Sequence, residues 1–196
     1  MANRTSRISR KTNETEIEIF LNIDGSGKSK IDTGIGFLDH MLELFAKHGF
    51  FDLAVRAAGD IKVDSHHTAE DVGIVLGQAI KEALGNKEGI KRYGSGRVPM
   101  DETLAQVDID LSGREFLIFN AQFSNDNIGG MQSQMFEEFF RAAAFNAGIT
   151  LHINLLYGKN DHHIAEAIYK AFAKALDTAT SSEARINGAL STKGCL

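Results

Sequence analysis

The sequence predicts an internally duplicated α+β protein built from two similar halves. Its apolar periodicity gives the order strand, strand, helix, strand, helix twice along the chain. A block of the form Asp-(x)-His-His-x-x-Glu occurs once in each half, at residues 64–70 and 161–166. We therefore expect half-repeats over residues 1–92 and 93–196, the second with a C-terminal tail, packed together as one compact unit.

The first half contains a predicted strand over Glu14–Ile23, in which apolar side chains alternate with polar ones. The turn that follows predicts that residues 28–31 return beside this strand as its hairpin partner. The polar and basic start, Met1–Lys11, is typical of a flexible arm. Two further short strands are predicted over residues 51–55 and 61–63, on either side of a turn.

Two helices complete the first half. The first is predicted over Phe37–Gly49 because its apolar residues form one stripe and glycine is a common helix stop. It carries His40 and His48, which are eight residues apart and therefore share roughly one face. The second helix begins at the block at residues 64–70, and its apolar stripe ends near Gly85.

The second half repeats this pattern after a linker predicted at Gly85–Pro99. A strand at residues 104–111 and its returning partner at 115–119 align with the first pair of strands when the numbering is shifted by 88. A helix at 132–145 and a strand at 149–153 then lead to the second His-His block. A shift of 96 superimposes the apolar stripes of the two helices that start at these blocks.

Composition narrows the class of protein. With 196 residues, of which 43% are hydrophobic, and charges of both signs, the chain is long enough and apolar enough for a substantial globular core. It has no apolar run that would span a bilayer. The net charge of -5 argues against a nucleic-acid partner. The single cysteine, Cys195, forms no internal disulfide and fits a reducing, cytoplasmic location, whereas the polar tail at 181–194 has the composition of a frayed end.

The two His-His blocks predict a metal site. On a helix, His66 and Glu70 stand at i,i+4, and His67 and Glu70 stand at i,i+3, so imidazole and carboxylate groups share one face. Imidazole and carboxylate ligands without thiolate suit a divalent metal such as Mn, Fe or Zn. One such block alone is weak support for a site, but two matching blocks in one short chain favour metal binding.

Adjacent histidines on a helix point about 100° apart, so His66 and His67 do not converge on one ion. The two histidines at one helix start therefore bind two different metals, or bind one metal in their own subunit and one in a neighbour. The second option predicts an oligomer whose site lies at an interface. The position in the second half that matches His40 is either Gln134 or Glu138, depending on where the alignment gap is placed.

Several segments together carry a specific resemblance to a known family. They are Gly36–Leu42, Asp64–Asp71, Arg92–Gly94, Pro99–Glu102, Ser112–Arg114, Asp161–Ala167 and Ser191–Gly194. In this order they resemble the imidazoleglycerol-phosphate dehydratases of histidine biosynthesis, from about Arg10 to the end of the chain.

The resemblance implies that each half is a four-stranded sheet packed with two helices. It also implies a shell of twenty-four subunits, with two Mn²⁺ ions in each active site shared between subunits. Carried over by position, the metal ligands are His40, His66, His67, Glu70, Glu138, His162, His163 and Glu166.

The same resemblance implies a dehydratase that converts imidazole glycerol phosphate, a small phosphorylated imidazole, to imidazole acetol phosphate. The expected acid–base groups are Glu14, Asp101 and Glu166, of which Glu14 ranks first. The expected substrate contacts are Glu14, His40, His48, Arg92, Arg114, Lys170, Ser191 and Lys193, with the cations among them on the phosphate. The alternatives are a binuclear metal hydrolase and a non-catalytic metal-binding assembly.

Overall fold

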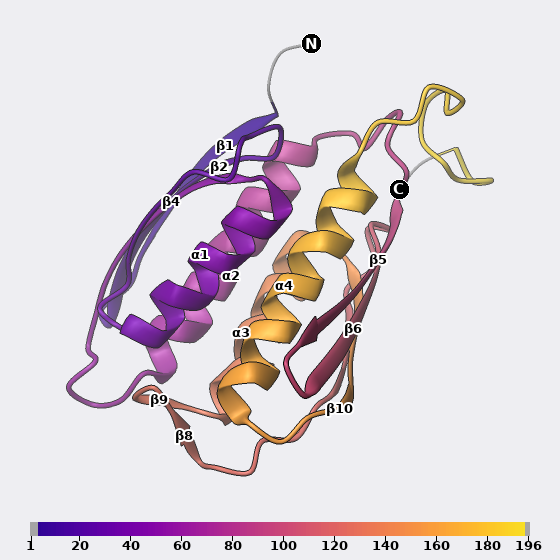
Figure 1. Cartoon of the computed structure of the whole chain (residues 1–196). Helices are drawn as coiled ribbons and strands as arrows, with labels where there is room; N and C mark the ends of the chain where they lie inside the picture. The colour runs from indigo at the N-terminus through magenta and orange to yellow at the C-terminus, as the bar shows by residue number, and fades with distance from the viewer. Residues whose placement is uncertain (1–3, 195–196) are drawn as a thin grey trace.

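Two four-stranded sheets enclose a layer of four helices. The computed structural model describes residues 4–194. Its sheets have the strand orders β1-β2-β4-β3 and β5-β6-β10-β7. Figure 1 shows α1 and α2 beside the first sheet, α3 and α4 beside the second, and the helices of the two halves packed against one another. This arrangement confirms the predicted α+β fold of two similar halves.

Each half contributes the same succession of three strands, a helix, a strand and a helix. The first half consists of β1 (Thr5–Lys11), β2 (Thr15–Asn22), β3 (Ser29–Asp32), α1 (Gly36–Gly49), β4 (Asp52–Gly59) and α2 (His66–Leu84). The second half consists of β5 (Tyr93–Met100), β6 (Thr103–Asp110), β7 (Phe116–Asn120), α3 (Gln134–Ala147), β10 (Thr150–Tyr157) and α4 (Asp161–Thr180), with the short pair β8 (Asn127–Ile128) and β9 (Met131–Gln132) before α3.

The two sheets also share their pairing. In the first, β2 is antiparallel to both β1 and β4, whereas β3 is parallel to β4. In the second, β6 is antiparallel to β5 and β10, and β7 is parallel to β10. Parallel neighbours need a crossover connection, and in each half a helix, α1 or α3, supplies it.

Three predictions in the first half were wrong. Residues 5–11 form the edge strand β1 rather than a flexible arm, because they pair with β2 and the hydroxyl of Ser6 donates to the carbonyl of Ala79 at 2.8 Å. Residues 28–31 are not the hairpin partner of β2. The Asp52 carboxylate accepts the N–H groups of Ser26 and Lys28, and this loop delivers β3 to the far side of β4. Residues 61–63 form a turn, closed by the Val63 N–H on the Asp60 carbonyl.

The predicted linker at 85–99 was wrong in its second part, because β5 begins at Tyr93. Gly94 and Gly96 lie directly against α4, where an added Cβ would be 1.9 Å from the Ala175 carbonyl oxygen and 2.2 Å from that of Ala171. These glycines therefore permit close strand–helix packing rather than chain flexibility. The predicted partner at 115–119 corresponds to β7, which begins at Phe116 and pairs with β10 in parallel, not with β6 as a hairpin.

The core lies between the sheets and around the four helices. Phe45, Phe140 and Phe172 are buried, with ring centroids of the Phe45–Phe172 and Phe140–Phe172 pairs both 5.3 Å apart. Between Thr5 and Thr180, no helix of the described chain is long and apolar enough to cross a membrane. Cys195, which was expected to form no internal disulfide, lies outside the described residues.

The contact between α2 and α3 depends on two glycines. An added Cβ on Gly73 would lie 2.6 Å from the carbonyl oxygen of Phe139, and one on Gly77 would lie 2.5 Å from that of Ala143. Both neighbours are backbone atoms of a buried helix, which do not move aside like the end of a flexible side chain. The two helices approach this closely only because these positions lack side chains.

We therefore predict that Gly73→Ala lowers the stability of the protein. Overpacking against the α3 backbone costs about 1–3 kcal/mol, which exceeds the gain of roughly 1 kcal/mol from replacing glycine within a helix. Thermal and denaturant unfolding at one protein concentration will measure the change. Gly36→Ala is the control, because nothing lies within 4 Å of its added Cβ, and its stability should match or exceed wild type. Equal stability of Gly73→Ala and wild type would contradict the packing argument.

Candidate active site

The two His-His pairs lie at the first turns of α2 and α4. In α4 the Asn160 side chain accepts the backbone N–H groups of His162 at 2.9 Å and His163 at 3.4 Å. In α2 the Asp64 carboxylate accepts the backbone N–H of His66 at 2.8 Å. These polar side chains start each helix where the sequence places its histidines. The imidazole rings are therefore carried on rigid elements.

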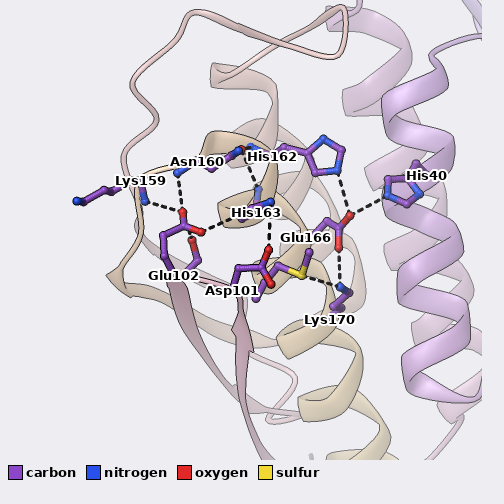
Figure 2. Close-up of polar contacts among 11 residues, drawn as sticks. His40, Asp101, Glu102, Lys159, Asn160, His162, His163, Glu166 and Lys170 are labelled. Carbon is purple, nitrogen blue, oxygen red and sulfur yellow. Dashed lines mark hydrogen bonds and ion pairs between the residues drawn. The ribbon is translucent and has the colours of Figure 1, made fainter.

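A cluster of three candidate ligands forms where α1 meets α4. One oxygen of Glu166 lies 3.0 Å from Nε2 of His40 and 3.0 Å from Nε2 of His162. Figure 2 shows both imidazole rings facing this carboxylate. The ligand atoms of these three residues all lie within 4.8 Å of one another. The other oxygen of Glu166 accepts from Nζ of Lys170 at 2.5 Å. Two imidazoles and a carboxylate therefore face one small volume.

Glu166 is ionised in this setting. Burial alone would raise the pKa of its carboxyl group, but the hydrogen bonds from Lys170, His40 and His162 outweigh burial and lower that pKa to about 2. The side chain is only 10% exposed, so its neighbours rather than water balance its charge. A permanently ionised carboxylate suits a metal ligand better than a proton donor.

In the other half, the residues that match this cluster do not all converge. Helices α1 and α3 both have 14 residues and begin at Gly36 and Gln134, so His40 aligns with Glu138 rather than with Gln134. His66 and Glu70 face each other at 3.5 Å across one turn of α2. Glu138, however, pairs with Arg141 at 3.1 Å. Among residues 4–194, only His40, His162 and Glu166 form a group of three potential ligands.

His67 and His163 point away from the cluster toward acidic side chains. Nδ1 of His67 lies 3.0 Å from a carboxylate oxygen of Asp60, and Nδ1 of His163 lies 2.7 Å from one of Glu102. These hydrogen bonds raise the pKa of both imidazoles. Sequence reasoning missed both partners. The shift of 88 that aligns the strands also places Glu14 on Glu102, and this signal would have identified the second partner.

Two predicted acid–base groups lie near the Nε2 atoms of these histidines. Glu14 lies 3.9 Å from Nε2 of His67, and Asp101 lies 3.8 Å from Nε2 of His163. Asp101 lies in the two-residue turn between β5 and β6 and has a left-handed backbone, with φ of 49°. Aspartate tolerates this conformation well, and the turn leaves its carboxylate exposed.

Most of the predicted phosphate contacts lie around a separate cavity, away from the ligand cluster. Arg92, Arg114, Ser191 and Lys193 line a cavity of about 1000 Å³, together with Arg185, which the sequence reasoning did not select. The guanidinium of Arg92 is held by Asp110 at 2.7 Å and donates to the Leu190 carbonyl at 2.7 Å.

The tail is therefore attached to the body of the protein. Its Gly188 carbonyl accepts the Gly89 N–H at 2.9 Å, and the Glu183 N–H donates to the Gly89 carbonyl at 2.9 Å. Composition alone suggested a frayed end, but these long-range hydrogen bonds hold residues 183–188 against Gly89, in the segment that precedes β5.

Lys170 and His48 lie outside this cavity. Lys170 pairs with Glu166 on α4. His48 lies two turns beyond His40 on α1, where burial lowers the pKa of its imidazole and the ammonium groups of Lys170 and Lys174 lower that pKa further. His48 is therefore a neutral ring at physiological pH.

The cavity and the ligand cluster lie at opposite ends of α4. His162 and Glu166 occupy the first turns of this helix, whereas the cavity is lined by the segment that follows its last residue, Thr180. Figure 1 shows α4 running from its orange start to its yellow end beside the tail. Its 20 residues span about 30 Å at 1.5 Å per residue. No small molecule bridges the two groups within a single chain.

Comparisons with known proteins are consistent in both sequence and structure. Residues 33–176 match the family model described as imidazoleglycerol-phosphate dehydratase. The imidazoleglycerol-phosphate dehydratase of Acetivibrio thermocellus is 62% identical over 193 residues, which cover 98% of this chain and 99% of that protein. The enzyme of the same name from Clostridium acetobutylicum is 59% identical over 193 residues, covering 98% of both proteins.

Two solved structures have the same fold. The crystal structure of imidazoleglycerol-phosphate dehydratase from Staphylococcus aureus aligns with a TM-score of 0.83 at 43% identity, covering 91% of this chain and 99% of that one. The structure of the Pyrococcus furiosus protein in complex with (S)-C348 aligns with a TM-score of 0.83 at 35% identity, covering 96% and 100%.

The charge network around Glu166 predicts a specific acid dependence of stability in the metal-free protein. Because the folded-state pKa lies below the unfolded value of 4.5, the stabilisation is present above pH 4.5 and is lost as the pH falls toward about 2. Its size is on the order of 3 kcal/mol. We expect the unfolding free energy of Glu166→Gln to decrease less steeply below pH 5 than that of the wild type. Denaturant titration in the presence of chelator will measure it. Glu70→Gln is the control, because its pair with His66 is exposed, and a wild-type slope in Glu166→Gln would refute the prediction.

Proposed function

The chain belongs to the imidazoleglycerol-phosphate dehydratase family and is a lyase of histidine biosynthesis, and we propose that it works with two Mn²⁺ ions per active site, held between copies of the chain. The observation that carries the metal proposal is the convergence of His40, His162 and Glu166, with ligand atoms within 4.8 Å of one another. The substrate is imidazole glycerol phosphate, and the products are imidazole acetol phosphate and water.

The donor set fits this metal. Imidazole nitrogens and carboxylate oxygens without thiolate suit Mn²⁺ and similar divalent ions. The ionised state of Glu166 removes the need to lose a proton before binding. His66 and Glu70 form the matching pair for the second ion, with Glu138 in the position that His40 occupies in the first.

A neighbouring copy completes each site in this proposal. Nε2 of His67 and of His163 point away from the His40 cluster of their own chain, as expected for adjacent histidines on one helix. The cationic cavity is also separated from the cluster by about the length of α4, roughly 30 Å. A substrate that contacts both a metal and Arg114 therefore needs residues from different copies. The family resemblance supports a shell of twenty-four.

The side chains divide the work of the reaction. When bound, the metal ions supply Lewis acidity and a template for the imidazole ring and the hydroxyl groups. In this proposal Glu14, which lies beside the ring of His67, removes the proton from the carbon next to the substrate imidazole. Asp101, which lies beside His163, gives a proton to the departing hydroxyl. The resulting enol becomes the ketone, and neither an oxidant nor an organic cofactor is required.

The cavity residues hold the phosphate in this proposal. Arg92 is already oriented by Asp110, and Arg114 and Lys193 add two further cations to the same wall. A guanidinium suits bidentate contact with phosphate oxygens, whereas an ammonium acts as a point charge. Lys170 neutralises Glu166 where α1 meets α4, and we assign it to the metal side of the substrate.

The reaction is tested by incubating the protein with imidazole glycerol phosphate and Mn²⁺ and following ketone formation. We expect a ketone product that keeps its phosphate, loss of turnover with chelator, and recovery when Mn²⁺ is restored. Release of inorganic phosphate would instead identify a binuclear hydrolase. Metal binding without turnover would identify a non-catalytic assembly. Full activity in the presence of chelator would refute the metal proposal.

The tail provides a second test. Deleting residues 190–196 removes Ser191 and Lys193 from the cavity and the Leu190 carbonyl from Arg92. Hydrogen bonds to charged groups contribute about 1.5–3 kcal/mol each, so we expect the KM to rise by roughly tenfold or more. Arg7→Ala is the control, because Arg7 pairs with Glu18 on the outer face of the first sheet. Wild-type kinetics of the shortened protein would show that the tail does not contact substrate.

A further inference from the structure

Two carboxylates outside the predicted site hold the histidines that diverge from the ligand cluster. Glu102, in the turn between β5 and β6, accepts a hydrogen bond from Nδ1 of His163 at 2.7 Å. The same Glu102 carboxylate accepts the backbone N–H groups of Lys159 at 3.1 Å and Asn160 at 2.8 Å, which fixes it to the start of α4 (Figure 2). In the other half, Nδ1 of His67 lies 3.0 and 3.2 Å from the two carboxylate oxygens of Asp60.

These carboxylates reach the same ring atom from different elements. The irregularity in β10 pairs Tyr157 with Leu104, and the residue that matches Leu104 in the first half, Glu16, pairs with Ala58, so Asp60 aligns with Lys159. Lys159 brings no carboxylate to this position. Glu102 supplies the carboxylate there instead. Its own counterpart, Glu14, lies near Nε2 of His67 rather than Nδ1. Both halves therefore place a carboxylate on Nδ1 despite different local sequences.

The carboxylate decides which nitrogen is available for a metal. An ionised carboxylate only accepts hydrogen bonds, so Nδ1 must carry the proton. In the neutral ring the lone pair is then on Nε2, and the hydrogen bond both orients the ring and makes Nε2 more basic. Both Nε2 atoms lie on the side of Glu14 or Asp101, where the chemistry is expected.

We propose that Asp60 and Glu102 are positioning residues that commit His67 and His163 to metal binding through Nε2, one residue for each of the two metals. This inference rests on the proposed function, because it assigns roles around the same metal pair. Since His67 and His163 are equivalent in the duplicated fold, they belong to different ions. Loss of one carboxylate should therefore weaken the binding of one ion and leave the binding of the other unchanged.

The test is Mn²⁺ titration of the full-length protein, with free Mn²⁺ followed by electron paramagnetic resonance, for wild type, Asp60→Asn, Glu102→Gln and the double variant. We expect each single variant to keep one site per chain at wild-type affinity and to bind the other about 10–100-fold more weakly. The double variant should weaken both. Asp108→Asn is the matched control, because Asp108 bonds Ser95 and Gln106 on the second sheet.

The unfolding temperature of the metal-free variants separates positioning from a structural role. In Glu102→Gln the side-chain amide carbonyl still accepts the Lys159 and Asn160 N–H groups, so this temperature should stay close to wild type. Wild-type affinity at both sites in the variants would overturn the inference. So would loss of both sites in a single variant together with a lower unfolding temperature. Failure of the wild type itself to bind Mn²⁺ would instead refute the proposed function.

Discussion

The arrangement of the site depends on the interactions of one buried group, the Glu166 carboxylate. It belongs to α4 in the second half, accepts from His40 on α1 in the first half, and is balanced by Lys170. With only 10% of its side chain exposed, it requires these partners to stay charged. The same contacts fix α1 against α4 and bring the candidate ligands together. Stability and chemistry therefore share one set of side chains at the junction between the halves.

The duplication preserves the backbone but not the side chains at the helix contacts. Gly73 and Gly77 allow α2 to lie against the α3 backbone, whereas the positions that match them in α4 are Tyr169 and Ala173. His40 in one half corresponds to Glu138 in the other, and Glu138 is held by Arg141. The two halves thus have the same fold but different residues around their candidate metal ligands. This inequality explains why only one of the two ligand clusters is already assembled among residues 4–194 of the single chain.

The sequence predicted the elements whose signals are local. The helices carrying His40 and the two His-His blocks follow from apolar stripes, and the i,i+4 spacing of His66 and Glu70 brings their side chains together. The edge strands β1 and β5 were missed because they lack a run of alternating apolar residues. The glycines of β5 are typical of a linker by composition, and only the packing of α4 on them explains their presence in a strand. Strand partners were also wrong for β3 and β7, because pairing depends on residues distant in the chain.

The sequence by itself determined the duplication, the family and most of the chemically active residues, because repeated spacing and residue type are local properties. Tertiary structure decided which of those residues meet. It joined His40 to Glu166 across 126 positions and gathered Arg92, Arg114 and Lys193 at the far end of α4. It also supplied Asp60 and Glu102, whose role arises only from the side chain that each one faces. Distance between side chains is set by packing, and spacing along the chain does not encode it.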